Sequence, residues 1–171
     1  MKHINTSLLM IISISLLFCG AAFADKQEVK DVVNLQGFNN SNISFGFKST
    51  DAGDPVHSTS MGSSSSKNVT HDYQSIPKNI GHYLCLPSGM DYQISSSCQS
   101  LLSQGSSNGC KENTVSYPPC SSGAAVIEPD CNWRTVDDKS KTATWTWTIQ
   151  YSSGGLYTVS CSESNYQGYQ Q

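Results

Sequence analysis

The residue type and spacing that most clearly suggest a nucleophile belong to a serine inside a glycine-flanked motif. The sequence GSSNG at 105–109 matches the G-x-S-x-G nucleophile elbow, a tight strand-to-helix turn that exposes its serine, here Ser107, above a parallel sheet. No long apolar strand precedes this segment, and Cys110 follows it directly. Because a short motif without its structural context is a weak signal, the segment is interpreted as a loop.

A serine nucleophile would also need a histidine base and a carboxylate that orients the histidine. The residues that could supply these roles are scattered along the chain: His57, His71, His82, Asp72 and Asp91. Nothing in their spacing indicates that they meet in space. No catalytic residue is therefore predicted, and the sequence favours a non-enzymatic protein over a small secreted hydrolase.

Acidic residues in loops form a second group, because carboxylates are oxygen ligands for calcium and, in pairs, can hydrolyse glycosidic bonds. They are Asp51, Asp54, Glu128, Asp130, Asp137 and Asp138. None follows the register of an EF-hand loop, and the distance between two carboxylates is a spatial quantity. Aspartate and glycine are also ordinary turn residues, so solvated turns are the better interpretation. No metal site and no cofactor are predicted.

Aromatic residues late in the chain form a third group. A flat row of exposed rings could stack on sugars, but a domain poor in leucine and isoleucine needs its large rings in the core. Trp145 and Trp147 are therefore predicted to be buried. Trp133, in a loop-like Cys-Asn-Trp segment, and Tyr117, in a Tyr-Pro-Pro loop, are the candidate ligand-binding residues.

Cysteine content indicates an oxidising compartment. Apart from Cys19 in the N-terminal apolar segment, the chain has an even set that lacks zinc-site spacing: Cys85, Cys98, Cys110, Cys120, Cys131 and Cys161. Three disulfides are predicted. Six cysteines allow 15 connectivities, among which the sequence does not choose. Because short loops close at lower entropic cost, Cys98–Cys110 and Cys120–Cys131 are the expected local pairs, and Cys85–Cys161 would then join the middle of the chain to its last strand.

The N-terminus has the features of a cleavable export signal. Lys2 and His3 precede the apolar run 8–18, and Ala22-Phe23-Ala24 then forms a small-x-small cleavage pattern. The run is about half the length that a membrane-spanning helix needs, so residues 1–24 are predicted to be removed. The mature protein would be one domain, residues 25–171, in the periplasm or outside the cell, without a transmembrane segment.

Charge composition excludes two classes of partner. Charged residues make up 13% of the chain, the formal net charge is −3, and Arg134 is the only arginine. Nucleic-acid binding and electrostatic attachment to anionic membranes both require clustered lysine and arginine. The sequence therefore predicts no nucleic-acid partner.

Alternation of apolar and polar residues predicts the elements that would position these side chains. Strands are expected at 29–35, 43–47, 80–86, 144–151 and 156–161, the last two joined by a Ser-Ser-Gly-Gly turn. A short helix is expected at 95–104, with serines at its start. Segment 49–67 is expected to be a mobile loop, and 165–171 a disordered end.

Short strands separated by turn-rich loops predict an all-β protein, with two antiparallel sheets packed as a sandwich or closed into a small barrel. Disulfides would staple the loops, and at most one short helix is expected. The expected function is an exported, non-catalytic binding or interaction protein whose ligand is a carbohydrate, a lipid headgroup or another protein. A small secreted hydrolase and a disulfide-rich protease inhibitor presenting the Tyr117 loop are the alternatives.

Overall fold

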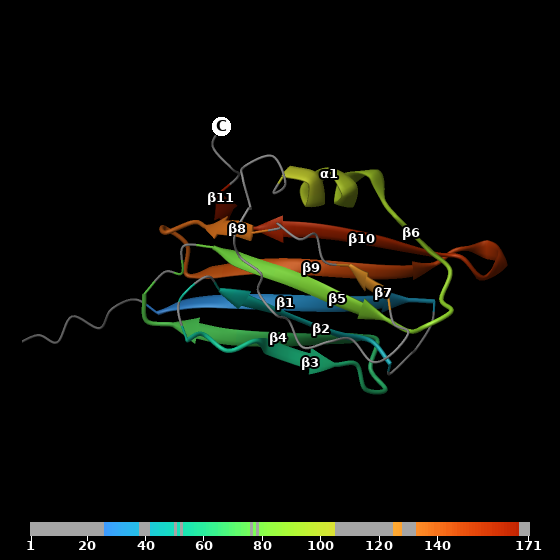
Figure 1. Ribbon diagram of the computed structural model, residues 1–171, viewed down its shortest axis with the longest axis horizontal. Coiled ribbons are helices and arrows are strands. Elements are labelled where there is room, and N and C mark those ends of the chain that lie inside the picture. The colour runs from blue at the N-terminus through green and yellow to red at the C-terminus, as the bar shows by residue number, and fades with distance from the viewer. Residues whose placement is uncertain are drawn as a thin grey trace, which may run out of the picture.

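Two β-sheets packed face to face form the fold in the computed structural model of the chain (Figure 1). The structure describes residues 26–37, 42–49, 51, 53–75, 77, 79–104, 125–127 and 133–167. One short α-helix lies within these residues. The prediction of an all-β sandwich with at most one short helix is confirmed for this part of the chain.

The first sheet has the strand order β4-β1-β9-β10-β6. Its strands are β4 (Ser66–Tyr73), β1 (Gln27–Gln36), β9 (Thr142–Tyr151), β10 (Tyr157–Ser164) and β6 (Tyr92–Ile94). β1 pairs with β9 in parallel, and so does β6 with β10, so this sheet is mixed rather than purely antiparallel. A parallel pair requires a long crossover, and every strand of the second sheet except the one at 166–167 lies in the chain between β1 and β9.

The second sheet has the order β11-β8-β5-β2-β3, and β7 pairs with β5 as well. Its strands are β11 (Tyr166–Gln167), β8 (Trp133–Val136), β5 (Ile80–Leu86), β2 (Ser44–Ser49), β3 (His57–Ser60) and β7 (Ala125–Ile127). Every residue of β5, an inner strand of this sheet, is buried. The strands predicted at 29–35, 43–47 and 80–86 are therefore confirmed as β1, β2 and β5.

The β9–β10 hairpin supplies the largest side chains of the core. Trp145 and Trp147 are fully buried and contact each other edge to face, with ring centroids 5.3 Å apart. Threonines alternate with them on the other face of β9. Gly154 and Gly155 adopt positive φ in the turn, a conformation that glycine reaches without strain. The predicted hairpin and the burial of both tryptophans are confirmed.

Helix α1 (Ser96–Gln104) begins where it was expected and packs against β10. The Ser95 hydroxyl accepts a hydrogen bond from the backbone N–H of Cys98 at 3.2 Å, which caps the first turn. The Cys98 side chain is buried and forms a disulfide with Cys161 of β10, with a Cα–Cα distance of 4.9 Å.

This disulfide corrects the predicted connectivity. Cys98–Cys110 and Cys85–Cys161 are wrong, because packing of α1 on β10 brings together two cysteines that are 63 residues apart in sequence. Cys85 is disulfide-bonded as well. Cys110, Cys120 and Cys131 lie outside the described residues, so the Cys120–Cys131 pair stays a prediction.

Three segments expected to lack regular structure contain strands. Segment 49–67 includes β3 and the start of β4, Tyr166 begins β11, and the backbone of Trp133 begins β8. β3 and the first half of β4 are edge segments in which serine, lysine and asparagine dominate. Their backbone pairs with a neighbouring strand, but few apolar side chains mark them in the sequence.

Truncation of Trp147 tests the assignment of the core. We expect Trp147→Ala to lower the free energy of unfolding by about 3–5 kcal/mol, because it removes burial and leaves a cavity. Thr146→Ala, on the opposite face of β9, should lower it by less than about 1 kcal/mol. Urea unfolding followed by tryptophan fluorescence measures both. A Trp147→Ala protein as stable as wild type would contradict the core assignment.

Removal of the described disulfide gives a second test. We expect Cys98→Ala/Cys161→Ala to lose about 2–4 kcal/mol, mainly because the unfolded chain gains freedom. Peptide mapping under non-reducing conditions should recover Cys98 linked to Cys161. A peptide linking Cys98 to Cys110 instead would show that the pairing found here is wrong.

Candidate functional site

A carboxylate and an imidazole meet in the middle of the sandwich. His82 Nδ1 lies 2.8 Å from Asp31 Oδ1, and both side chains are completely buried. Asp31 takes an inward position of β1 between Val29 and Val33, and His82 belongs to β5 of the opposite sheet. This hydrogen bond therefore joins the two sheets through their core.

Aromatic and charged side chains surround this pair. The His82 ring stacks on Trp145 at a centroid distance of 4.8 Å, and the Tyr166 ring meets it edge-on at 5.5 Å. The Arg134 guanidinium lies 5.7 Å from the centre of the Trp145 ring and forms an ion pair with Glu163 at 3.1 Å. Tyr166 was expected in a disordered end; the expectation is wrong because its ring completes this core cluster.

Exclusion of water dominates the acid–base properties of the cluster. Burial raises the pKa of Asp31, and the attraction of His82 offsets only part of that rise. Burial likewise raises the pKa of Glu163 against the opposing effect of Arg134. The pKa of the Tyr166 hydroxyl is raised well above its ordinary value, again mainly by burial. An ionised carboxylate is tolerated here only beside a cationic or hydrogen-bonding partner.

The Asp31–His82 pair resembles the acid–base half of a hydrolytic triad, but a substrate cannot reach it. His82 Nε2 finds no hydrogen-bond partner among the described residues, and the ring is 0% exposed. A general base must come within hydrogen-bond distance of the proton that it removes. We therefore assign the pair a structural role.

A second cluster lies at the open edge of the sandwich, where the edge strands β3 and β4 come side by side (Figure 1). His57 Nε2 lies 3.0 Å from Asp54 Oδ1, and the His57 and His71 rings stack with centroids 3.8 Å apart. The other oxygen, Asp54 Oδ2, accepts hydrogen bonds from the Tyr73 hydroxyl at 2.8 Å and the Ser49 backbone N–H at 3.2 Å. Three residues from three strands, Ser49, His57 and Tyr73, thus hold one carboxylate.

Hydrogen bonding outweighs burial at this carboxylate. Partial burial raises the pKa of Asp54, but the hydrogen bonds from Ser49, Tyr73 and His57 lower it by more, so the group stays ionised at neutral pH. The pKa of Tyr73 is raised by burial and by the adjacent Asp54 charge. The Ser49 hydroxyl binds the carboxylate rather than an imidazole. The serine-to-histidine hydrogen bond of a triad is therefore missing from this cluster.

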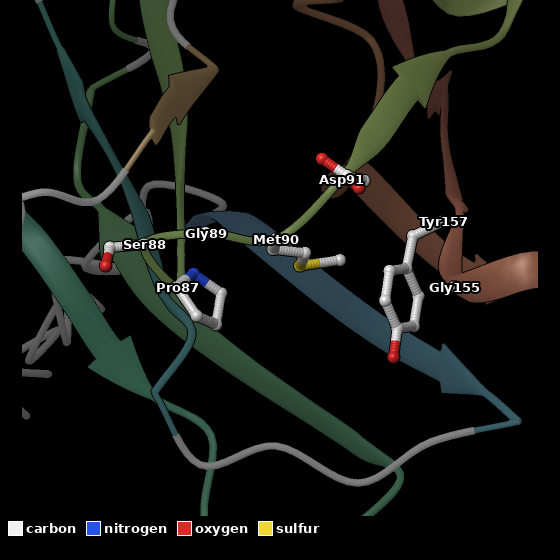
Figure 2. A pocket seen from close by; sticks show the side chains of 7 residues that line it. All are labelled: Pro87, Ser88, Gly89, Met90, Asp91, Gly155 and Tyr157. Atoms are coloured by element: carbon white, nitrogen blue, oxygen red, sulfur yellow. The ribbon is translucent and has the colours of Figure 1, made fainter.

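A pocket of about 280 Å³ opens at the other end of the sandwich. Two turns form it: Pro87, Ser88, Gly89, Met90 and Asp91 between β5 and β6, and Gly155 and Tyr157 at the β9–β10 turn. The Tyr157 N–H donates to the Asp91 carbonyl at 3.0 Å and ties the turns together. Figure 2 shows the Met90 side chain pointing towards the Tyr157 ring, while the Asp91 carboxylate points away from that ring.

An exposed aromatic residue adjoins the pocket. Tyr151, at the end of β9, is 46% exposed, and its ring lies edge to face with Tyr157 at a centroid distance of 5.4 Å. Among the described residues it is the one large apolar side chain with this degree of exposure. The last residue of the alternating β9 run thus extends past the core and into solvent.

The structure places the candidate residues of the sequence analysis in different parts of the fold. Asp91 lines the pocket, whereas Asp72 is exposed on β4 and Asp137 accepts hydrogen bonds within a turn, from the Lys139 N–H and the Ser140 hydroxyl. Trp133 has its backbone in β8, opposite Gly81. Ser107 and Tyr117, with the loops around them, lie outside the described residues.

Sequence reasoning did not identify the two peripheral sites. The alternation of Val69, His71 and Tyr73 on β4 could have placed His71 and Tyr73 on one inward face. The approach of β3 to β4 had no signal in the sequence, because it depends on how the two sheets pack.

No protein-family model matches the chain, and neither a curated protein nor a solved structure shows significant similarity to it. Within the described ranges, no helix has the length and apolar character that crossing a bilayer requires.

Mutation of the buried pair tests its structural role. We expect Asp31→Ala and His82→Ala each to destabilise the fold by about 3–5 kcal/mol, because each leaves a polar partner buried and unpaired. The double variant should cost clearly less than the sum of the two single variants, because the two side chains interact directly. Asp72→Ala, on the exposed face of β4, should unfold close to wild type. Strict additivity of the two core variants in chemical denaturation would contradict a direct interaction.

Proposed function

We propose that this chain is an exported, non-catalytic carbohydrate-binding protein whose ligand site is the pocket beside Tyr157. The observation that carries the proposal is the pair of tyrosines at this pocket, one in its wall and one exposed next to it. Sugars present apolar C–H faces that stack on aromatic rings and hydroxyl groups that bind polar atoms at the rim.

The composition of the pocket supports a neutral, partly apolar ligand. Pro87, Met90 and Tyr157 provide apolar surface, while Ser88 and Asp91 provide hydroxyl and carboxylate groups. None of the seven lining residues is a lysine, arginine or histidine. A phosphate-bearing lipid headgroup would lack a cationic partner here, so a carbohydrate fits better.

The arrangement of the acid–base groups supports binding without catalysis. The Asp31–His82 pair is buried in the core. At the Asp54–His57 pair, the Ser49 hydroxyl donates its hydrogen bond to the carboxylate and not to the imidazole. Neither pair lies among the residues that line the pocket. A ligand in the pocket would therefore meet hydrogen-bonding and stacking groups and a single carboxylate, Asp91, with neither a histidine nor a second carboxylate among the lining residues.

Two observations support export. The Cys98–Cys161 disulfide and the bonded Cys85 fit an oxidising compartment. The predicted signal at residues 1–24 lies outside the described residues and supplies the route. The proposal therefore places the protein in the periplasm or outside the cell.

A glycan array probed with the oxidised protein, expressed with its own export segment, tests the proposal. We expect binding to neutral glycans, and perturbation of NMR signals at residues 87–91 and 151–157 by a bound sugar. Tyr151→Ala should weaken binding about 2- to 12-fold, the effect of one aromatic contact. Because Tyr151 is 46% exposed, this variant should fold normally.

Matched variants separate stacking from non-specific effects. Tyr151→Phe keeps the ring and should bind as wild type does, and Asn68→Ala on β4, at the opposite edge of the sheet, should have no effect. Absence of binding to any glycan would contradict the carbohydrate proposal. Unchanged binding by Tyr151→Ala together with Met90→Ala would show that the pocket is not the site.

A further inference from the structure

Two histidines and an aspartate converge at the edge of the sandwich, far from the pocket. Asp54, His57 and His71 each offer one ligand atom, and these three atoms lie within 4.8 Å of one another. Two imidazoles and one carboxylate form a ligand set that suits Zn²⁺ and Cu²⁺, and they leave coordination positions open for water.

The spacing of the closest two donors fits one ion. Two ligand bonds of about 2.1 Å place their donor atoms about 3.0 Å apart at the right angle of a square-planar Cu²⁺ site, and about 3.4 Å apart at the tetrahedral angle of a Zn²⁺ site. His57 Nε2 and Asp54 Oδ1 are separated by 3.0 Å. An ion in this position would replace the proton that the two atoms share, and the half-buried His71 ring would turn out of its stack on His57 to become the third ligand.

The carboxylate is already oriented by its other oxygen. Asp54 Oδ2 accepts hydrogen bonds from the Tyr73 hydroxyl and the Ser49 N–H, so Oδ1 is directed at His57. Such outer contacts hold a ligand in place before the ion arrives and raise the affinity of metal sites. The His57 and Asp54 side chains are 14% and 9% exposed, so solvent reaches the cluster.

The chain offers few competing imidazoles. It has four histidines; His3 lies in the predicted signal, and His82 is fully buried with its Nδ1 on Asp31. An ion that seeks imidazole nitrogen on the folded mature protein therefore meets His57 and His71. These two residues belong to β3 and β4, the edge strands of opposite sheets.

We propose that Asp54, His57 and His71 form a binding site for a divalent transition-metal ion, Cu²⁺ or Zn²⁺, that clips together the free edges of the two sheets. The site is separate from the sugar pocket and does not depend on it. Because both strands supply ligands, a bound ion favours the folded state over the unfolded chain. Cu²⁺ binds more tightly than Zn²⁺, as the general order of affinities requires.

Titration of the metal-free, oxidised protein with CuCl₂ or ZnCl₂ tests the proposal. We expect one equivalent of either ion to bind and to raise the melting temperature by several degrees at saturation. The electron paramagnetic resonance spectrum of the Cu²⁺ form should show coupling to two imidazole nitrogens. His57→Gln and His71→Gln should each weaken binding at least 10-fold.

Controls distinguish coordination from unfolding and from general acidity. Asp72 follows His71 on the same strand, but its side chain is exposed. The Asp72→Asn variant should therefore bind metal as wild type does. Asp54→Asn should weaken binding, because an amide oxygen is a poorer ligand for these ions than a carboxylate. Circular dichroism checks that each variant is folded. If a variant fails to fold, the electron paramagnetic resonance spectrum of the wild-type Cu²⁺ form still tests the proposal.

Two outcomes would overturn the proposal. One is a wild-type Cu²⁺ spectrum without two equatorial imidazole nitrogens, or no saturable binding at micromolar ion concentrations. The other is folded His57→Gln and His71→Gln proteins that bind as tightly as wild type. In either case the stacked histidines and the aspartate form a hydrogen-bonded edge contact only.

Discussion

The hydrogen bond between Asp31 and His82 is the constraint around which the sandwich is organised. Both groups are fully buried, one in each sheet. Burial of an unpaired carboxylate is strongly unfavourable, so β1 and β5 must face each other in the register that joins these two side chains. Trp145, Tyr166 and the Arg134–Glu163 ion pair then fill the remaining space around the imidazole. Polar groups thereby specify an arrangement that apolar packing alone would leave less restricted.

Because the core is closed to solvent, a ligand can reach only the groups at the periphery of the sandwich. The Asp31–His82 pair is shielded from solvent in the core. In the part of the chain that the structure describes, two candidate sites are open to solvent: the β3–β4 edge, and the end formed by the 87–91 turn and the β9–β10 turn. Strands and short turns form both places, which is why we propose ligand binding there.

The edge cluster also addresses a structural liability. Edge strands expose unpaired backbone groups that can associate with other chains, and natural sheets protect them with short strands and polar side chains. β3 has four residues and is rich in serine, and β4 carries lysine, asparagine and aspartate. The stacked His57 and His71 rings join these two edges across the opening of the sandwich. One set of side chains can thus both close the edge and offer ligands.

Local patterns in the sequence predict the fold class, strands at 29–35, 43–47, 80–86 and 144–151, the short helix and the burial of both tryptophans, and the structure confirms each of them. These features have local signals, because alternation and turn residues act over a few neighbouring positions. Four features depend on tertiary packing: the Cys98–Cys161 bond, the mixed first sheet, the contact of the Tyr166 ring with His82, and the stacking of His57 on His71. Each of these joins residues that are distant in sequence and has no periodic pattern of its own. Such contacts follow from how the two sheets pack, and packing is a property of the whole chain.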